Sequence, residues 1–182
     1  HLRLHQPKNP YCPSCIRAKM MRRYAKRRRS LPQRIPEKFG DLVNADHLLA
    51  QSPESMGLFG ERDALLIVDR ATLYVDAYPL KTKSAKDALW AFKEYFGTDS
   101  PQDVYVWSDS AQELTSAVKT LELPHGRGTP GRHTANGYCE QYIRRVVDGA
   151  RSLLGHAGLP SCYWVFAIRY WCFAHNLSLI HI

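Results

Sequence analysis

Three acidic residues are spaced so that their carboxylates could meet at one site. Asp46 lies inside an apolar segment with the spacing of a strand, where an unpaired carboxylate would be costly. Asp109 directly follows the apolar segment 104–107, at the C-terminal end of another expected strand, where open α/β sheets usually place their sites. Glu140 falls in the first turns of an amphipathic helix, on its polar face. Because Mg²⁺ prefers oxygen ligands, these acids are candidate ligands for divalent metal ions.

The same spacing allows a simpler interpretation, because acids at strand ends and helix starts commonly form turns and caps. His47, next to Asp46, is expected on the opposite face of the strand and in a structural role. Asp69 is expected in a hairpin turn, and Asp76 on a strand edge or a solvent face. Three cysteines in apolar, helical settings are expected to fill the core: Cys139, Cys162 and Cys172.

The N-terminal residues offer a separate set of metal ligands. Cys12 and Cys15 form a Cys-x2-Cys pair, which is typical of structural zinc sites. His5 is expected as a further zinc ligand in preference to His1. The alternative is that the two cysteines are surface thiols in a proline-containing turn.

The positive charge of the chain is concentrated in one short segment. The 182 residues carry 25 Lys and Arg against 17 Asp and Glu, a formal net charge of +8. Segment 17–29 contains eight basic residues and no acid, so the remainder is neutral overall. Such a block is typical of an arm that binds nucleic acid, although a nuclear address or a solvated linker has the same composition. The eight are Arg17, Lys19, Arg22, Arg23, Lys26, Arg27, Arg28 and Arg29.

The overall composition excludes several classes of protein. With 45% hydrophobic and 23% charged residues, the chain is expected to be globular rather than disordered, collagen-like or a coiled coil. The apolar stretch 162–174 is interrupted by Arg169, so a membrane span is not expected. No secretory signal is visible, and the cysteine pattern suits a reducing compartment better than a disulfide scaffold.

The order of the apolar segments predicts a mixed α/β domain. Residues 126–132, rich in Gly and Arg, are expected to form a loop. Three strands in a meander precede a fourth strand that a helix connects, so the sheet is expected to contain both antiparallel and parallel pairs. Strands are expected over 41–50, 64–68, 72–80 and 104–107, and helices over 84–96, 112–121, 136–154 and 163–176.

Several stretches resemble the integrases of retroviruses and long-terminal-repeat retrotransposons. They are HQPKNPYCPSCIRAKM from His5, FGDLVNADH (39–47), VDRATLYVDAYPL (68–80), VYVWSDSAQEL (104–114) and TPGRHTANGYCEQYIRRVVDGAR (129–151). The resemblance implies a ribonuclease-H-like mixed sheet flanked by helices, with a small N-terminal zinc-binding segment. The implied divisions are a partial zinc-binding module (1–16), a basic linker (17–38), a catalytic core (39–176) and a tail that continues no family pattern (177–182).

The resemblance also implies roles for individual residues. Asp46, Asp109 and Glu140 match the three acids that hold Mg²⁺ or Mn²⁺ ions in the family. Asn136-Gly137 matches the dipeptide that precedes the family's Glu. The zinc ligands of the family match Cys12, Cys15 and, less closely, His5 and His1.

The activity implied by the resemblance is DNA integration. Water first trims a DNA end, and the new 3′-hydroxyl then attacks a phosphodiester of the target DNA. The implied partners are element and target DNA and further copies of the chain, with no membrane, and the implied location is the nucleus, with cytoplasmic particles as a second possibility. Contact with nucleic acid is expected for Arg22, Arg23, Lys26, Arg27, Arg28, Arg29, Arg127, Arg132 and Arg144.

Two departures from the family pattern keep other functions open. Between Asp109 and Glu140 there are 30 residues, fewer than in the family, and Ser110-Ala111 stand where the family has Asn-Gly. A degenerate or domesticated copy that binds DNA without catalysis is therefore an alternative, as is another ribonuclease-H-like nuclease. The sequence is also expected to be a fragment without the C-terminal DNA-binding domain.

Overall fold

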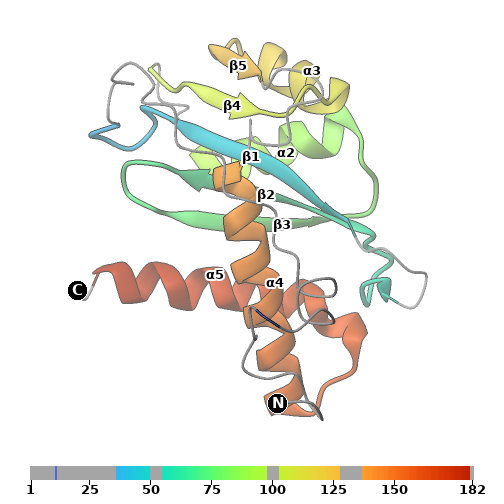
Figure 1. The fold of residues 1–182 in the computed structure, drawn as a ribbon. Coiled ribbons are helices and arrows are strands. Elements are labelled where there is room, and N and C mark those ends of the chain that lie inside the picture. The colour runs from blue at the N-terminus through green and yellow to red at the C-terminus, as the bar shows by residue number, and fades with distance from the viewer. Residues whose placement is uncertain (1–10, 12–35, 50–54, 98–102, 128–136, 181–182) are drawn as a thin grey trace. The chain divides into compact units, whose positions relative to one another are not determined.

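The computed structural model describes residues 11, 36–49, 55–97, 103–127 and 137–180 (Figure 1). By its internal contacts the chain divides into two compact units, His1–Arg34 and Ile35–Ile182. All helices and strands given below belong to the second unit.

The described part of the second unit contains a five-stranded mixed sheet with the order β3-β2-β1-β4-β5. The β1–β2 and β2–β3 pairs are antiparallel, whereas the β1–β4 and β4–β5 pairs are parallel. The expected mixed sheet, an antiparallel meander extended by parallel strands and flanked by helices, is confirmed. The strands are β1 (Val43–Leu49), β2 (Asp63–Asp69), β3 (Val75–Leu80), β4 (Val106–Ser108) and β5 (His125–Arg127).

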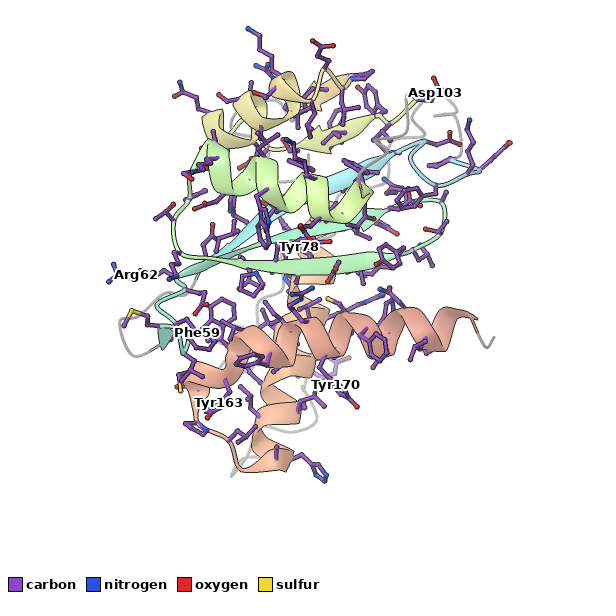
Figure 2. All side chains as sticks on the ribbon, turned by 180° about the vertical axis from the view of Figure 1, so that it is seen from behind. Phe59, Arg62, Tyr78, Asp103, Tyr163 and Tyr170 are labelled. Carbon is purple, nitrogen blue, oxygen red and sulfur yellow. The ribbon has the colours of Figure 1, made fainter. Side chains whose placement is uncertain are left out.

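Helices cover both faces of this sheet. They are α2 (Ala85–Phe96), α3 (Gln112–Thr120), α4 (Gly137–Ala157) and α5 (Trp164–Ile180), with the short 3₁₀ helix η2 (Ser161–Tyr163) before α5. Figure 1 shows α4 in front of the sheet, and Figure 2, seen from behind, shows α2 on the opposite face. Within the described residues, no helix is both long enough and apolar enough to cross a membrane.

Alternation along the strands separates two cores. Leu65 and Ile67 of β2 pack with α2 and α3, whereas Leu66 and Val68 pack with α4 and α5. All seven residues of β2 are buried, because this strand lies inside the sheet and helices cover both of its faces. The side chains of β1 follow the same alternation, so neighbouring residues of β1 face different cores.

Three segments differ from the sequence-based expectation. Residues 126 and 127 belong to β5 and not to a loop, because Gly126 leaves room for the side chains of Tyr105 and Trp107, which a Cβ at this position would meet. The third strand begins at Val75 rather than at residue 72, because the chain turns after Asp69 and Leu73 adopts a positive φ of 63°. The last helix ends at Ile180, beyond the expected end at residue 176.

Helix α5 protects the edge of the sheet. Strand β3 is an edge strand, and Asn176 of α5 donates to the Val75 carbonyl at 2.8 Å and accepts from the Val75 N–H at 3.1 Å. The next N–H on this side, that of Ala77, donates to the Asp76 carboxylate at 2.8 Å, and Pro79 has no N–H. The outward N–H groups of β3 are therefore paired or absent, which prevents pairing with another strand.

Candidate active site

The register of β1 and β4 places two of the candidate acids side by side. The last parallel pair is Ala45 with Ser108, so Asp46 and Asp109 are the next residues on neighbouring strands. Asp46 lies opposite Leu66, whose side chain packs in the α4 core, and paired residues of neighbouring strands share a face. The two acids therefore project from the α4 face of the sheet, at the C-terminal end of β4.

The third acid, Glu140, lies on α4 and follows Cys139, a buried thiol whose pKa all three carboxylates raise. Cys139 is fully buried, and its pKa is raised first by burial and then by the negative charges of Asp46, Glu140 and Asp109. A charge changes a pKa substantially only from close range. Asp46, Asp109 and Glu140 thus each lie near Cys139, which is in the first turn of α4.

The carboxylate of Asp46 is held by the backbone of its own strand. It accepts the His47 N–H at 2.8 Å. The Val43 N–H points toward β4, where it donates to the Tyr105 carbonyl at 2.9 Å, and N–H directions repeat at every second residue. The His47 N–H therefore points toward the same side, beyond the end of β4, and it draws the Asp46 carboxylate toward Asp109.

Asp109 also forms a turn. Its Oδ1 accepts the Ala111 N–H at 3.2 Å, and Ala111 is the N-cap of α3 with no side-chain cap of its own. The turn-forming interpretation of this acid is thus correct, and it is compatible with the position beside Asp46. Asp109 is exposed, so one face of its carboxylate is accessible to a ligand.

Glu140 and Arg144 lie one helical turn apart on α4. Glu140 is half-buried and Arg144 is exposed, and neither forms an ion pair within the described residues. The opposite side of the helix, which includes Tyr142 and Val146, is buried against the sheet. Glu140 therefore stands at the border of the core.

The chemistry of this donor set fits Mg²⁺ or Mn²⁺. Three carboxylates supply hard oxygen ligands, and Mg²⁺ usually takes one or two carboxylates together with waters and substrate phosphates. In the part of the chain that the structure describes, no three His, Cys, Asp or Glu side chains are close enough to hold an ion by themselves. Asp46 and Asp109 are therefore suited to a site that water and a phosphate of the substrate complete.

His47 lies on the far face of the sheet from Asp46. Its buried side chain forms an ion pair with buried Asp63 at 2.5 Å and lies 3.9 Å from Glu113, which also pairs with Lys83 at 3.2 Å. Burial raises the pKa of Glu113, but hydrogen bonds and the positive charges of Lys83 and His47 outweigh burial, so the pKa lies below its usual value. This cluster ties β1 and β2 to α3, which is the structural role expected for His47.

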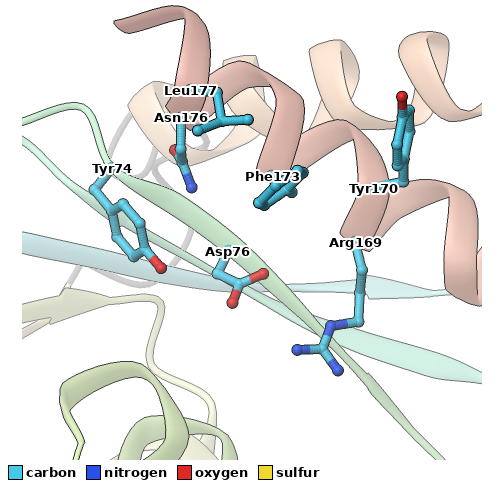
Figure 3. Close-up of a pocket in the computed structure, with 7 residues that line it drawn as sticks. All are labelled: Tyr74, Asp76, Arg169, Tyr170, Phe173, Asn176 and Leu177. Carbon is cyan, nitrogen blue, oxygen red and sulfur yellow. The ribbon is translucent and has the colours of Figure 1, made fainter. Parts of the chain in front are cut away.

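The other two acids also occupy the expected places. Asp69 is fully buried at the end of β2 and accepts hydrogen bonds from the N–H groups of Gly40, Ala71 and Thr72 and from the Thr72 hydroxyl. Asp76 lies on edge strand β3, in a groove of about 490 Å³ against α5 (Figure 3). The groove is lined by Tyr74, Asp76, Arg169, Tyr170, Phe173, Asn176 and Leu177, so it contains none of the three candidate acids.

Two of the expected DNA-binding residues are within the described structure. Arg127 is exposed at the end of β5. Because it is paired with Ser108, it lies at the same edge of the sheet as Asp109. Arg144 is exposed on α4, one turn after Glu140. The remaining candidates lie outside the described residues: Arg22, Arg23, Lys26, Arg27, Arg28, Arg29 and Arg132 for DNA, and His1, His5, Cys12 and Cys15 for zinc.

Two further arginines, which sequence analysis did not single out, lie over aromatic rings of α4. The Arg70 guanidinium lies 4.2 Å from the centre of the Tyr138 ring, and that of Arg145 lies 5.2 Å from the centre of the Tyr142 ring. The two rings are neighbours, with centroids 5.3 Å apart on the first turns of α4. The spacing of Tyr138 and Tyr142 indicates a shared helix face, but no sequence signal brings Arg70 from the β2–β3 turn to it.

Comparison with curated proteins identifies relatives among transposon polyproteins. The chain is 31% identical over 108 residues to the retrovirus-related Pol polyprotein from transposon RE2 of Arabidopsis thaliana, a match that covers 57% of this chain and 7% of the relative. It is 28% identical over 147 residues to that from transposon TNT 1-94 of Nicotiana tabacum, covering 76% and 11%. The chain thus spans 7–11% of the length of these relatives. No protein-family model matches the sequence.

Comparison with solved structures gives a likeness to the catalytic core domain of BIV integrase. The TM-score is 0.49 and the sequence identity 14%, over 71% of this chain and 81% of the other.

Proposed function

We propose that this chain, which is integrase-like and related to the retrovirus-related Pol polyproteins of transposons, is an integrase catalytic domain that processes DNA 3′ ends and joins them to target DNA. One observation carries the proposal. Asp46 and Asp109 are the next residues after the last β1–β4 pair, and Glu140 lies in the first turn of α4, the helix that packs on the same face of the sheet. A set of carboxylates at the C-terminal edge of a sheet suits metal-dependent phosphodiester chemistry.

In this proposal Asp46 and Asp109, with Glu140 completing the set, hold Mg²⁺ or Mn²⁺. When bound, such ions activate an attacking oxygen and stabilise the charge that develops on the leaving oxygen. The His47 N–H fixes the carboxylate of Asp46, and the Ala111 N–H fixes that of Asp109, so both ligands are oriented before the substrate binds.

The reaction needs no covalent intermediate with the protein. A water oxygen attacks a phosphodiester near the DNA end and releases a short nucleotide, which leaves a free 3′-hydroxyl. That hydroxyl then attacks a target phosphodiester, so one P–O bond forms as another breaks. Arg127 lies at the same edge of the sheet as Asp109, and Arg144 lies one turn after Glu140. In this proposal both contact phosphates, which sets the position of the DNA without reading its sequence.

The proposal extends to the partners and the location of the protein. The basic segment 17–29 adds salt-sensitive affinity for DNA, Cys12 and Cys15 with His5 or His1 hold zinc, and the protein acts in the nucleus. Homo-oligomers are supported by three aromatic side chains of α5 that are about half exposed: Phe166, Tyr170 and Phe173.

The second candidate function is a degenerate copy that binds DNA without cutting it. It is favoured by the turn at Asp109, where Ser110-Ala111 follow and Oδ1 already accepts the Ala111 N–H. It is also favoured by the separation of the acids, since no three of the described ligand-type side chains can hold one ion unaided.

A strand-transfer assay distinguishes the two functions. A duplex oligonucleotide with the element's terminal sequence is incubated with a plasmid target and Mn²⁺ or Mg²⁺. We expect joined products from the native chain, a loss of at least about 100-fold in Asp109→Asn, and unchanged DNA binding. The control is Asp148→Asn, at an exposed acid of the same helix as Glu140, which should retain activity.

The other outcomes each have a meaning. Equal activity in Asp109→Asn would refute the assignment of the acids. DNA binding without any metal-dependent product would favour the degenerate copy. Cleavage of RNA–DNA hybrids without joined products would identify another ribonuclease-H-like nuclease.

A further inference from the structure

A chain of hydrogen bonds links β5 to the peptide of Asp109. The Nε2 atom of His125, the first residue of β5, lies 2.9 Å from the Oγ of Ser108. The Ser108 hydroxyl in turn lies 2.8 Å from the Asp109 carbonyl oxygen and donates to it. Ser108 is fully buried, so its hydroxyl exchanges these partners for water only if the local structure opens.

The direction of both hydrogen bonds follows from the donors available. A carbonyl oxygen can only accept, so the single proton of the Ser108 hydroxyl is used on Asp109. The same oxygen must then accept from His125, which places a proton on Nε2 of the imidazole. Burial and the nearby Arg127 charge lower the pKa of His125, so the ring is neutral at pH 7 and carries this one proton on Nε2.

The position of this link matters because the sheet ends there. The β1–β4 ladder stops at the pair Ala45 with Ser108, and Asp109 is the first residue that the ladder does not hold. The Asp109 carboxylate accepts the Ala111 N–H at 3.2 Å, at the long end of hydrogen-bond distances. The buried Ser108 hydroxyl is thus the contact that fixes the Asp109 peptide at the point where the chain leaves the sheet.

We infer that His125, acting through the Ser108 hydroxyl, is a positioning residue that holds Asp109 in place for a divalent cation. The inference rests on the proposed function, since it assumes that Asp109 is a ligand. His125 does not touch the cation or the DNA. Residues that orient the ligands of a metal typically change its affinity by about 10- to 100-fold when they are replaced.

The test compares two replacements of His125 that differ in one N–H group. His125→Gln keeps a side-chain N–H donor, whereas His125→Leu has a similar size and no donor. Binding of Mn²⁺ to the full chain without DNA is measured by titration calorimetry, and melting without metal is recorded for each variant. We expect His125→Leu to raise the Kd for Mn²⁺ by about 10-fold or more, and His125→Gln to stay within about 3-fold of the native chain. Melting without metal should be similar in both.

Ser108→Ala tests the same link from its other end. It should weaken Mn²⁺ binding as His125→Leu does, and the double variant should lose no more than either single variant, because both changes break one chain of hydrogen bonds. Ser152→Ala is the control, since it removes an equivalent hydroxyl that donates to the Asp148 carbonyl at 2.8 Å, on the exposed side of α4. It should leave the Kd unchanged.

The possible failures are distinguishable. If the native chain binds Mn²⁺ and Asp109→Asn does not, but His125→Leu and Ser108→Ala bind like the native chain, the inference is wrong and the proposed function stands. If Gln and Leu at position 125 weaken binding equally, the N–H donor is not the cause and the inference is also wrong. If the native chain shows no Mn²⁺ binding that Asp109→Asn removes, both the proposed function and the inference are overturned.

Discussion

Asp46 and His47 are neighbours on β1, but their side chains lie on opposite faces of the sheet. Asp46 faces α4 and the candidate active site, while the side chain of His47 is buried on the other face, within 2.5 Å of Asp63. The two are linked because the N–H of His47 is also the hydrogen-bond donor to the Asp46 carboxylate. The burial of His47 therefore fixes the backbone that orients Asp46.

We predict that His47→Ala destabilises the protein by about 3–5 kcal/mol, because it leaves the Asp63 carboxylate buried without a partner. Replacing both residues by Leu should cost less than the single change, since no buried charge is then left unpaired. Denaturant unfolding measures both. His156→Ala, at an exposed position at the end of α4, is the control and should have little effect. A loss below about 1 kcal/mol for His47→Ala would show that the pair is not buried as described.

The raised pKa of Cys139 predicts a loss of stability at high pH. The folded thiol keeps its proton to higher pH than the unfolded thiol, so its contribution is complete below the unfolded pKa near 9.0 and declines as the pH rises above it. The free energy of unfolding should therefore fall between about pH 8 and pH 10. Cys139→Ala should reduce this fall, whereas Cys162→Ala, at a half-buried residue, should leave it unchanged. Identical pH profiles for all three proteins would contradict the burial of Cys139.

At the scale of elements, α5 has a second role besides packing on the sheet. Its Asn176 side chain hydrogen-bonds both the N–H and the carbonyl of Val75, which would otherwise be exposed at the edge of β3. Val75 is fully buried with Asn176 in place, and removing Asn176 leaves both of these backbone groups without their partner.

Asn176→Ala should therefore cost about 1–3 kcal/mol of stability and increase aggregation through the freed edge. Ser178→Ala, two residues later on an exposed position, removes a hydroxyl that bonds only the His175 carbonyl of its own helix. This control should change stability by less than about 0.5 kcal/mol. Unfolding and light scattering of the two variants check the prediction, and equal behaviour would contradict the role of Asn176.

The elements that sequence patterns predicted well are those with a long apolar signal. The strands of the meander and α2 and α4 have such patterns, and Asp109 was placed correctly because it follows an apolar run directly. Strand β5 could not be predicted, because its three residues, His125–Arg127, contain no apolar side chain and the ladder with β4 is formed by backbone groups. The His125–Ser108 hydrogen bond could not be predicted from sequence either, because it depends on the register between β4 and β5.

At the scale of the whole molecule, the charge distribution predicts how DNA binding depends on salt. The excess of +8 lies entirely in segment 17–29, and each Lys or Arg that contacts phosphate contributes about 0.9 to the slope of log K against log salt. Replacing Arg22, Arg23, Lys26 and Arg27 by Gln should therefore reduce the slope by up to about 4. The control carries the same charge change at four exposed lysines of the folded unit, Lys81, Lys86, Lys93 and Lys119.

Fluorescence anisotropy with a labelled duplex at several salt concentrations measures both slopes. We expect a large reduction of the slope for the basic segment and a small one for the four lysines. Equal reductions would mean that binding follows total charge rather than the segment, and the DNA-binding role of residues 17–29 would have to be abandoned.

The position of Mn²⁺ in crystals of the protein, located by its anomalous scattering, tests the proposed metal site. We predict an anomalous peak between the carboxylates of Asp46 and Asp109, about 2.0–2.1 Å from their oxygens, with Glu140 nearby. The same peak should be absent in Asp109→Asn. A peak elsewhere, or none beside these acids at saturating Mn²⁺, would contradict the assignment of the three carboxylates as a metal site.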